Sequence, residues 1–434
     1  MANILIAIIS ILLFARILQT KASVPLPIGI MGLTLVVYSF FPEQINISAE
    51  SNFDGIIYLL LPLVLLPDTL NFKLADLKKH GIAIFYLSFV AVVLSIVVGV
   101  IFNFVIFSEY AFTTGALISL FAMVLATDAV SVGSIFSQFK LPHSLKVLTE
   151  GESLFNDATA VIAFFFIGLP LMNGIEVTPA DVGITLVRVV TVSVLIGLVV
   201  GYFGKLLLSV LHTVTDEFIV VLLTAYVAFG IAENHHVHVS GILALIVAIL
   251  TLQYFISKQF NSLDSANLLS EESGEPKTSK KIRVITTRAR LDENKQIIAF
   301  FALFANAVLF FTLAELIEFE KIMHYWKEIL TLFVATTMIR AMMMLKFSYI
   351  SRQVNKIADV SYRWWAILTF AGIKGGLSII MVHALPDSFE YKEMFEQVVM
   401  GIIVLSIFVY SLVLLFVIKK YEDEFIEDMK AEEH

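Results

Sequence analysis

The chain is a series of long apolar runs separated by short polar segments. Most runs contain about 17–25 residues, the length that crosses the hydrocarbon layer of a membrane as an α-helix. Thirteen can be delimited by charges, Pro or Gly: Ile4–Thr20, Leu26–Phe41, Gly55–Phe72, Gly81–Phe107, Phe112–Ser137, Val147–Pro170, Val182–Leu211, Glu217–Glu233, Val239–Ile256, Ile297–Glu318, Glu328–Leu345, Tyr362–Leu385 and Met394–Ile418. The pattern predicts an all-α polytopic membrane protein with about thirteen transmembrane helices.

Two polar segments divide this series. Ser257–Gln296 is polar, rich in Ser and mixed in charge, which predicts a cytoplasmic loop between the ninth and tenth spans. The last residues, 419–434, form an acidic stretch that we expect to be a solvated cytoplasmic tail. Residues 1–256 therefore hold spans one to nine, and residues 297–418 hold spans ten to thirteen. Lipid headgroups could bind the basic part of the loop, although a solvated linker is the simpler interpretation.

Composition agrees with a membrane protein. Of the 434 residues, 59% are hydrophobic and 15% are charged, whereas soluble domains have about 25% charged residues. The chain has no cysteine, which excludes disulfides, thiolate metal sites and thiol nucleophiles. We expect no cofactor, and we expect the lipid bilayer rather than nucleic acid as the surrounding partner.

The basic residues predict an orientation. With the N-terminus outside, 22 of the 29 Lys and Arg residues fall in cytoplasmic segments and three in outer loops. Cytoplasmic loops of membrane proteins carry such an excess. We expect an N-out, C-in protein of the plasma membrane, the inner membrane of a bacterium or archaeon. Thirteen spans also fit two inverted six-span repeats joined by a linker helix.

The fifth span carries a charge at mid-membrane depth. A charge there costs roughly 2.5–3.5 kcal/mol on insertion scales, so each one suggests function. Asp128 follows Thr127 within ATDAVSVG, and both side chains can compete with the helix for backbone hydrogen bonds. Local unwinding would free carbonyl oxygens for a cation. The alternative is a continuous helix in which a basic side chain pairs with Asp128.

The sixth span gives the strongest signal. Ser153, Asn156 and Asp157 are spaced i, i+3 and i+4, so they share one helix face. Glu152 lies beside that face. Carboxylate, amide and hydroxyl oxygens suit a hard cation. The alternative, a helix start with acids in its first turn, fits Glu150 but not Asp157, about ten residues into the span.

Two buried bases accompany these acids. Arg340 lies deep in the eleventh span and needs a buried anion, and Lys374 lies in the twelfth within FAGIKGGLS. The three glycines around Lys374 permit a broken helix or close helix contacts. Spans five and twelve occupy equivalent places in the two halves, and interrupted spans in corresponding positions indicate a midplane binding site. The histidines of ENHHVH (233–238) could bind a metal, but a short loop between helices is favoured.

These motifs resemble those of the NhaP/NHE-type monovalent cation:proton antiporters. ATD with Val130 and Val132 resembles the family's ATDPVAV stretch, and GESLFND resembles its sixth-span motif. GIKGG resembles its glycine-flanked basic motif, and FALFANAVLFF and LPLVLL resemble two further segments. The resemblance extends from about residue 25 to about residue 418. It implies two discontinuous crossing helices and a homodimer in which a core domain moves against a scaffold domain.

The resemblance also implies roles for individual residues. Asp157 would be the carboxylate that binds proton or cation, and Asp128, Thr127 and Ser153 would complete a Na+ site. Asn156 would orient these groups. A structural ion pair would form between Glu152 and Arg340, and the charge of Lys374 would offset helix dipoles at the crossing.

Three departures from the family pattern stand out. Ala129 replaces the usual Pro after the Asp, and Lys374 replaces the usual Arg. In the third span the family's acid position falls on Pro67, with Asp68 one residue later. We therefore do not transfer the family's ion-pathway role to Asp68.

The predicted function is secondary transport that exchanges Na+ or Li+ for H+, a role in pH homeostasis. Burial favours the protonated form of Asp157, so that cation and proton would compete there. One carboxylate beside Asn156 indicates electroneutral exchange. A K+/H+ antiporter of the same fold and a non-transporting ion sensor remain alternatives. An enzyme is not expected, since GESLF lacks the final Gly of G-x-S-x-G and the chain has no HExxH.

Overall fold

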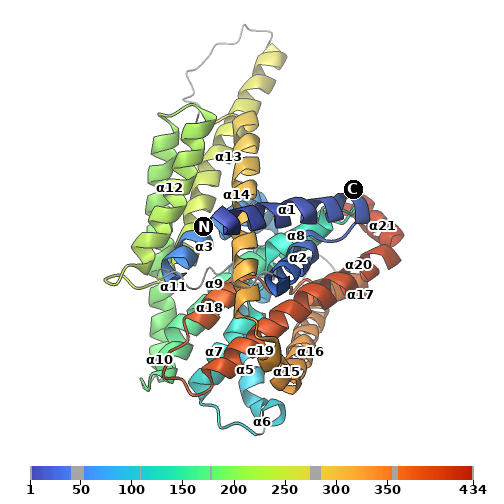
Figure 1. Cartoon of the computed structure of the whole chain (residues 1–434). Coiled ribbons are helices and arrows are strands. Elements are labelled where there is room, and N and C mark those ends of the chain that lie inside the picture. Colours follow the sequence, from blue (N-terminus) through green and yellow to red (C-terminus); the bar gives the residue numbers. More distant parts are fainter. Residues whose placement is uncertain are drawn as a thin grey trace. The chain divides into compact units, whose positions relative to one another are not determined.

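The computed structural model describes residues 2–40, 53–107, 109–175, 178–273, 285–353 and 360–432. Within these ranges every regular element is a helix, so the predicted all-α class is confirmed. In the described part of the chain, ten helices are long and apolar enough to cross a membrane, and two shorter apolar helices accompany them. The twelfth predicted run is divided between two short helices (Figure 1).

The first half of the chain, up to the long helix that follows residue 178, contains α1 (Ala2–Ala22), α2 (Leu26–Phe40), α3 (Phe53–Asn71), α4 (Leu74–Phe85), α5 (Ala91–Ile101), α6 (Asn103–Ile106), α7 (Thr114–Leu125), α8 (Ala129–Phe136), α9 (His143–Ala163), α10 (Leu169–Met172) and α11 (Pro179–Leu208). The second half contains α12 (Val214–Glu233), α13 (Gly241–Ser273), α14 (Arg288–Leu316), α15 (Phe319–His324), α16 (Trp326–Ser351), α17 (Tyr362–Phe370), α18 (Gly376–His383), α19 (Lys392–Leu405), α20 (Ser411–Lys420) and α21 (Glu422–Glu432).

Among the described residues, three spans contain a turn of π-helix, in which hydrogen bonds join residues five apart. These are η2 (Tyr86–Val90) between α4 and α5, η3 (Phe164–Gly168) between α9 and α10, and η4 (Ser406–Tyr410) between α19 and α20. Such turns are rare in proteins as a whole, but those that occur often lie at functional sites. Here η2 and η3 both pack against α9, the helix of the GESLFND motif.

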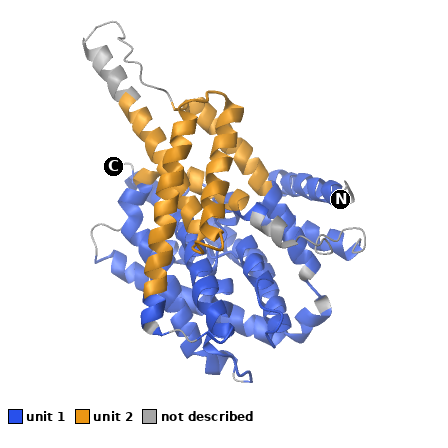
Figure 2. Cartoon of the chain, turned by 90° about the vertical axis from the view of Figure 1, so that its left-hand side faces the viewer, with its two compact units in different colours: residues 1–61, 76–183, 304–434 blue, residues 62–75, 184–303 orange. Residues whose placement is uncertain are grey.

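The chain forms two compact units, shown in different colours in Figure 2. The larger unit comprises residues 1–61, 76–183 and 304–434, and it contains α7, α8, α9, α16, α17 and α18. The smaller unit comprises residues 62–75 and 184–303. In it α12 packs along α13 (Figure 1). Each boundary falls inside a helix, namely α3, α4, α11 and α14.

The polar segments contain more helix than their composition suggests. α13 continues to Ser273 and α14 begins at Arg288, so both enter the predicted loop 257–296. Hydropathy marks only the part of a helix inside the bilayer, and residues such as Leu, Gln and Arg continue a helix in water. Residues 274–284 of that loop lie outside the described ranges.

The acidic tail also differs from the expectation of a solvated segment. It forms α21, whose Phe425 is fully buried. The Asp428 carboxylate accepts hydrogen bonds from Arg363 at 2.8 Å and from the Trp364 indole at 3.0 Å. The tail therefore packs against the start of α17. The sequence did not predict this packing, because the stretch is short and mostly acidic.

Candidate functional site

The fifth span is interrupted where Thr127 and Asp128 predicted unwinding. α7 ends at Leu125 and α8 begins at Ala129, so the continuous-helix alternative does not apply. Asp128 caps α8, because its Oδ1 accepts the N–H of Val130 at 3.1 Å and its Oδ2 accepts the hydroxyl of Ser131. A carboxylate suits this position, since the first N–H groups of a helix lack partners and carry partial positive charge. The break thus forms without the usual proline.

The twelfth span is interrupted in the same manner. α17 ends at Phe370, α18 begins at Gly376, and residues 372–375 are not helical. The two breaks meet where the N–H of Asp128 donates to the carbonyl of Ile373 at 2.8 Å. A Cβ atom on Gly375 would lie 2.5 Å from the Cβ of Asp128, and one on Gly372 would lie 2.6 Å from Nε of Arg340. Glycine fits at both positions because the side chains of Asp128 and Arg340 fill the space that a Cβ would occupy.

The shared face of α9 lies against the first break. Ser153, Asn156 and Asp157 are 2%, 1% and 6% exposed. Oδ1 of Asp157 accepts the N–H of Thr127 at 3.3 Å. The hydroxyl of Ser153 donates to the Thr127 carbonyl at 2.9 Å and accepts from the Thr127 hydroxyl at 3.1 Å. The structure therefore brings together three of the four predicted cation ligands, Asp157, Ser153 and Thr127, whereas both carboxylate oxygens of the fourth, Asp128, accept hydrogen bonds within α8.

Asn156 organises the same region. Its Nδ2 donates to the Leu125 carbonyl at 3.0 Å, the Thr127 hydroxyl at 3.2 Å and Oε1 of Glu152 at 3.3 Å. Three acceptors around one atom support this orientation of the amide. Within the described part of the chain, Oδ1 of Asn156 has no hydrogen-bond partner. A buried acceptor of this kind costs about 1–3 kcal/mol, so Oδ1 is a further oxygen available to a cation.

The predicted pair of Glu152 and Arg340 is present and bidentate. Nη1 and Nη2 of Arg340 donate to the two carboxylate oxygens at 2.9 and 2.8 Å, and both side chains are buried. Nε of Arg340 also donates to the carbonyls of Leu368 and Thr369 at 3.2 and 3.0 Å. Those carbonyls lie in the last turn of α17, where a cation is stabilised by the helix dipole. Arg340 thus joins α9, the helix that carries Glu152, to the end of α17 at the second break.

Lys374 lies within the second break and is 3% exposed. Its charge interacts electrostatically with Glu152 and Asp157 and is repelled by Arg340. Its N–H donates to the Ser406 hydroxyl at 3.0 Å, at the start of η4. This placement in the crossing agrees with the expected position of the helix-end charge.

Sequence reasoning missed three serines at this site. Ser131 binds the Asp128 carboxylate, Ser406 binds the backbone of Lys374, and the Ser378 hydroxyl donates to the Met123 carbonyl at 2.7 Å. Serine is ordinary in apolar helices, and most of its partners here are backbone groups. The only available signal was proximity to motifs already singled out.

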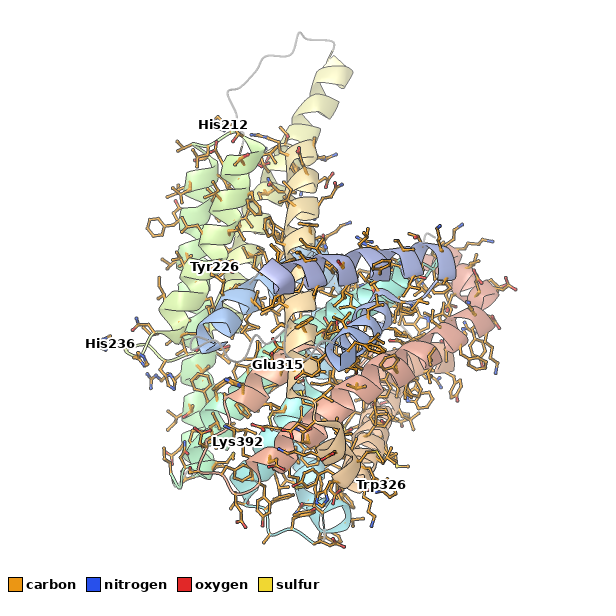
Figure 3. The ribbon with its side chains drawn as sticks, in the orientation of Figure 1. His212, Tyr226, His236, Glu315, Trp326 and Lys392 are labelled. Carbon is orange, nitrogen blue, oxygen red and sulfur yellow. The ribbon has the colours of Figure 1, made fainter. Side chains whose placement is uncertain are left out.

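In the histidine-rich segment 233–238, Glu233 ends α12 and residues 234–238 form a loop. Figure 3 shows His212 and His236 near opposite ends of this helix, with His236 directed away from it. Among the described residues, no group of three His, Cys, Asp or Glu side chains could hold a metal ion.

Two interrupted helices crossing beside a buried carboxylate, carbonyl and hydroxyl define a secondary transporter of small cations. The sequence matches the transmembrane sodium/hydrogen exchanger model over residues 4–420, and the chain belongs to this family.

Individual relatives support this assignment. The chain is 27% identical to the Na+/H+ antiporter ApNhaP of Aphanothece halophytica over 90% of its own length and 68% of the relative's. It is 26% identical to the Na+/H+ antiporter NhaH of Halobacillus aidingensis over 95% and 94% of the two lengths. Among solved structures, the sodium proton antiporter MjNhaP1 of Methanocaldococcus jannaschii superposes with a TM-score of 0.74 at 14% identity, covering 94% of this chain and 98% of that one. This likeness shows the antiporter fold.

Proposed function

We propose that the protein exchanges Na+, or Li+, for H+ across the plasma membrane by competition of the two ions at Asp157. The observation that carries this proposal is the contact of the buried Asp157 carboxylate with the backbone of Thr127 at the break between α7 and α8. The family's name and the names of its relatives support sodium and proton as the exchanged ions.

The site's own hydrogen bonds suggest how a cation enters. The Thr127 carbonyl accepts from Ser153, and the Ser153 hydroxyl accepts from Thr127. A Na+ ion would replace these bonds with ligation by the Asp157 carboxylate, the Thr127 carbonyl, the Ser153 hydroxyl and Oδ1 of Asn156. Oxygen ligands of this kind suit a hard cation. A proton on Asp157 would remove the charge that holds the cation, so either ion excludes the other.

We further propose an electroneutral exchange of one cation for one proton. Glu152 is neutralised by Arg340 at 2.8 Å, and both oxygens of Asp128 accept hydrogen bonds as the cap of α8. Asn156 carries no charge. Asp157 is then the carboxylate of the α9 face that gains and loses a proton in each cycle.

The remaining parts of the proposal concern the assembly and its setting. We propose a homodimer with its N-terminus outside and its C-terminus in the cytoplasm, in a bacterial or archaeal inner membrane. The charge distribution supports the orientation, and sidedness can be read from a reporter fused to the C-terminus. No enzymatic activity is proposed.

The decisive experiment is cation-dependent proton movement in proteoliposomes, measured with Na+, Li+ and K+ separately. Asp157→Asn should leave less than about a tenth of wild-type exchange, because the amide cannot bind and release a proton. Asp181→Asn, an exposed side chain of the larger unit, is the matched control and should exchange like the wild type. Normal exchange by Asp157→Asn would refute competition at this residue. Cation binding to the wild type without proton movement would indicate an ion sensor.

A further inference from the structure

At the break between α7 and α8, backbone N–H and carbonyl groups bind other partners instead of forming helical hydrogen bonds with each other. In a continuous α-helix, the carbonyl of each residue accepts the N–H four residues later. Across the break, the N–H of Asp128 donates to Ile373 instead of Val124, and the carbonyl of Leu125 accepts from Asn156 instead of Ala129. These helical bonds are therefore replaced by bonds to another span or, at the start of α8, to the Asp128 side chain.

The first of these lost bonds is the important one. It would join the Met123 carbonyl to the N–H of Thr127. In the structure the carbonyl of Met123 accepts the hydroxyl of Ser378 at 2.7 Å, and the N–H of Thr127 donates to Asp157 at 3.3 Å. Ser378 and Asp157 thus hold the two halves of one helical bond apart.

The hydrogen bonds made by Asp157 and by Ser378 differ in whether they persist through ion exchange. The Asp157 carboxylate must rearrange whenever it exchanges a proton for a cation. Ser378 is 0% exposed, lies in α18 on the other interrupted helix, and is not among the proposed cation ligands. When Asp157 turns from the Thr127 N–H toward a cation, the hydrogen bond from Ser378 to Met123 still fixes the last turn of α7.

We propose that Ser378 is a positioning residue for the cation site, because its hydrogen bond to the Met123 carbonyl fixes the last turn of α7 against α18 and so opposes the movement by which α7 would wind onward through Thr127. Winding would turn the Thr127 carbonyl away from Asp157 and Ser153. The inference rests on the proposed exchange at Asp157. The structure supplies its second anchor, the bond from Asp128 to Ile373 at 2.8 Å, which also comes from the second interrupted helix.

The test compares Ser378→Ala with Ser119→Ala in proteoliposomes. Ser119 lies in α7, is also 0% exposed, and its hydroxyl has no hydrogen-bond partner within the described residues. Loss of one buried hydrogen bond acting on the site should raise the KM for Na+ about three- to tenfold in Ser378→Ala. Ser119→Ala should keep the wild-type KM, and Ser378→Cys, which retains a weak donor, should lie between the two.

A merely structural role gives a different result. It would lower the melting temperature and the maximal rate while the KM for Na+ stayed as in the wild type. Protection of purified Ser378→Ala against thermal unfolding by Na+ gives a second measure of affinity if transport is lost, and its midpoint should shift to higher Na+. An unchanged KM or midpoint overturns the inference. Failure of the wild type itself to exchange would instead overturn the proposed function.

Discussion

Arg340 uses its planar group of donors for two partners. Nη1 and Nη2 bind Glu152, while Nε binds the Leu368 and Thr369 carbonyls. Removing one member of a buried pair leaves an uncompensated charge, whereas removing both can be nearly neutral. Here the carbonyls of α17 would still lose their donor, so removal of both partners should not be neutral.

This geometry makes a thermal-stability cycle informative. Glu152→Gln and Arg340→Gln should each cost about 3–5 kcal/mol, and the double variant should lose less than the sum while remaining below the wild type. Lys321 and Glu318, joined at 2.8 Å but largely exposed, form the control pair and should show a coupling below about 1 kcal/mol. Thermal unfolding of the purified variants measures both couplings. Simple additivity at Glu152 and Arg340 would show that the two are not partners and would make Glu152 a candidate cation ligand.

Asn156 offers a test of charge at the site. In Asn156→Asp the donor to the Leu125 carbonyl is lost, and a second carboxylate faces Glu152, which is 3.3 Å from the present Nδ2. Like charges resist joint ionisation, so the pair should hold its proton to higher pH. Exchange should therefore fall most at acidic and neutral pH and should depend on membrane potential.

Exchange by this variant should be measured over a range of pH with and without an imposed potential. Asn156→Ala, which removes the same donor without adding charge, is the control and should show a lower rate with no new potential dependence. Identical pH and potential profiles for the aspartate variant and the wild type would place Asn156 outside the site.

At the scale of residues, charges could be predicted and their neutral partners could not. Asp157, Asp128, Glu152, Arg340 and Lys374 were recognisable because ionic groups are expensive in a membrane. Their partners here include carbonyls, N–H groups and serine hydroxyls, which occur throughout any apolar helix. Which of them accept or donate depends on contacts between different spans, and the bond from Ser378 to Met123 joins residues 255 apart in the sequence.

At the scale of elements, the two breaks followed from local chemistry. Thr127 and Asp128 supplied competing hydrogen-bonding groups, and the glycines around Lys374 permitted close approach. The tail helix α21 was missed, because its composition describes a solvated segment. Its last turn also contacts the start of α9, because the Glu432 carboxylate accepts the N–H groups of His143 and Ser144 at 2.8 and 3.3 Å.

This contact predicts an effect of the tail on α9. Glu432 acts as a cap for the first N–H groups of the helix, a contribution of about 1 kcal/mol. Glu432→Ala should lower the melting temperature by about 2 °C and speed amide hydrogen exchange at His143 and Ser144. Glu427→Ala, which removes the same charge from an exposed position of α21, should leave both unchanged. Equal protection of those two amides in both variants would show that the tail does not cap α9.

At the scale of the whole molecule, hydropathy located the spans but not their grouping. The predicted division at the polar loop follows chain order, whereas the compact units combine distant segments. Residues 62–75, for example, belong with residues 184–303. Such grouping depends on which apolar faces meet, and nearly uniform apolar spans carry little information about that. The chain passes between the units at four points, each within a helix, so continuous helical backbone joins them.

The π-turns have a consequence for comparing this chain with its relatives. A π-turn accommodates one residue more than an α-helix of the same length, so the stripes of side chains before and after it remain aligned only if that residue is counted. In η4 the extra residue lies between Ser406, which holds the backbone of Lys374, and Tyr410, which bonds Thr337 at 2.6 Å. A relative with a regular α-helix here would align correctly only with a one-residue gap. Ungapped alignments of this span would pair the wrong faces of the helix.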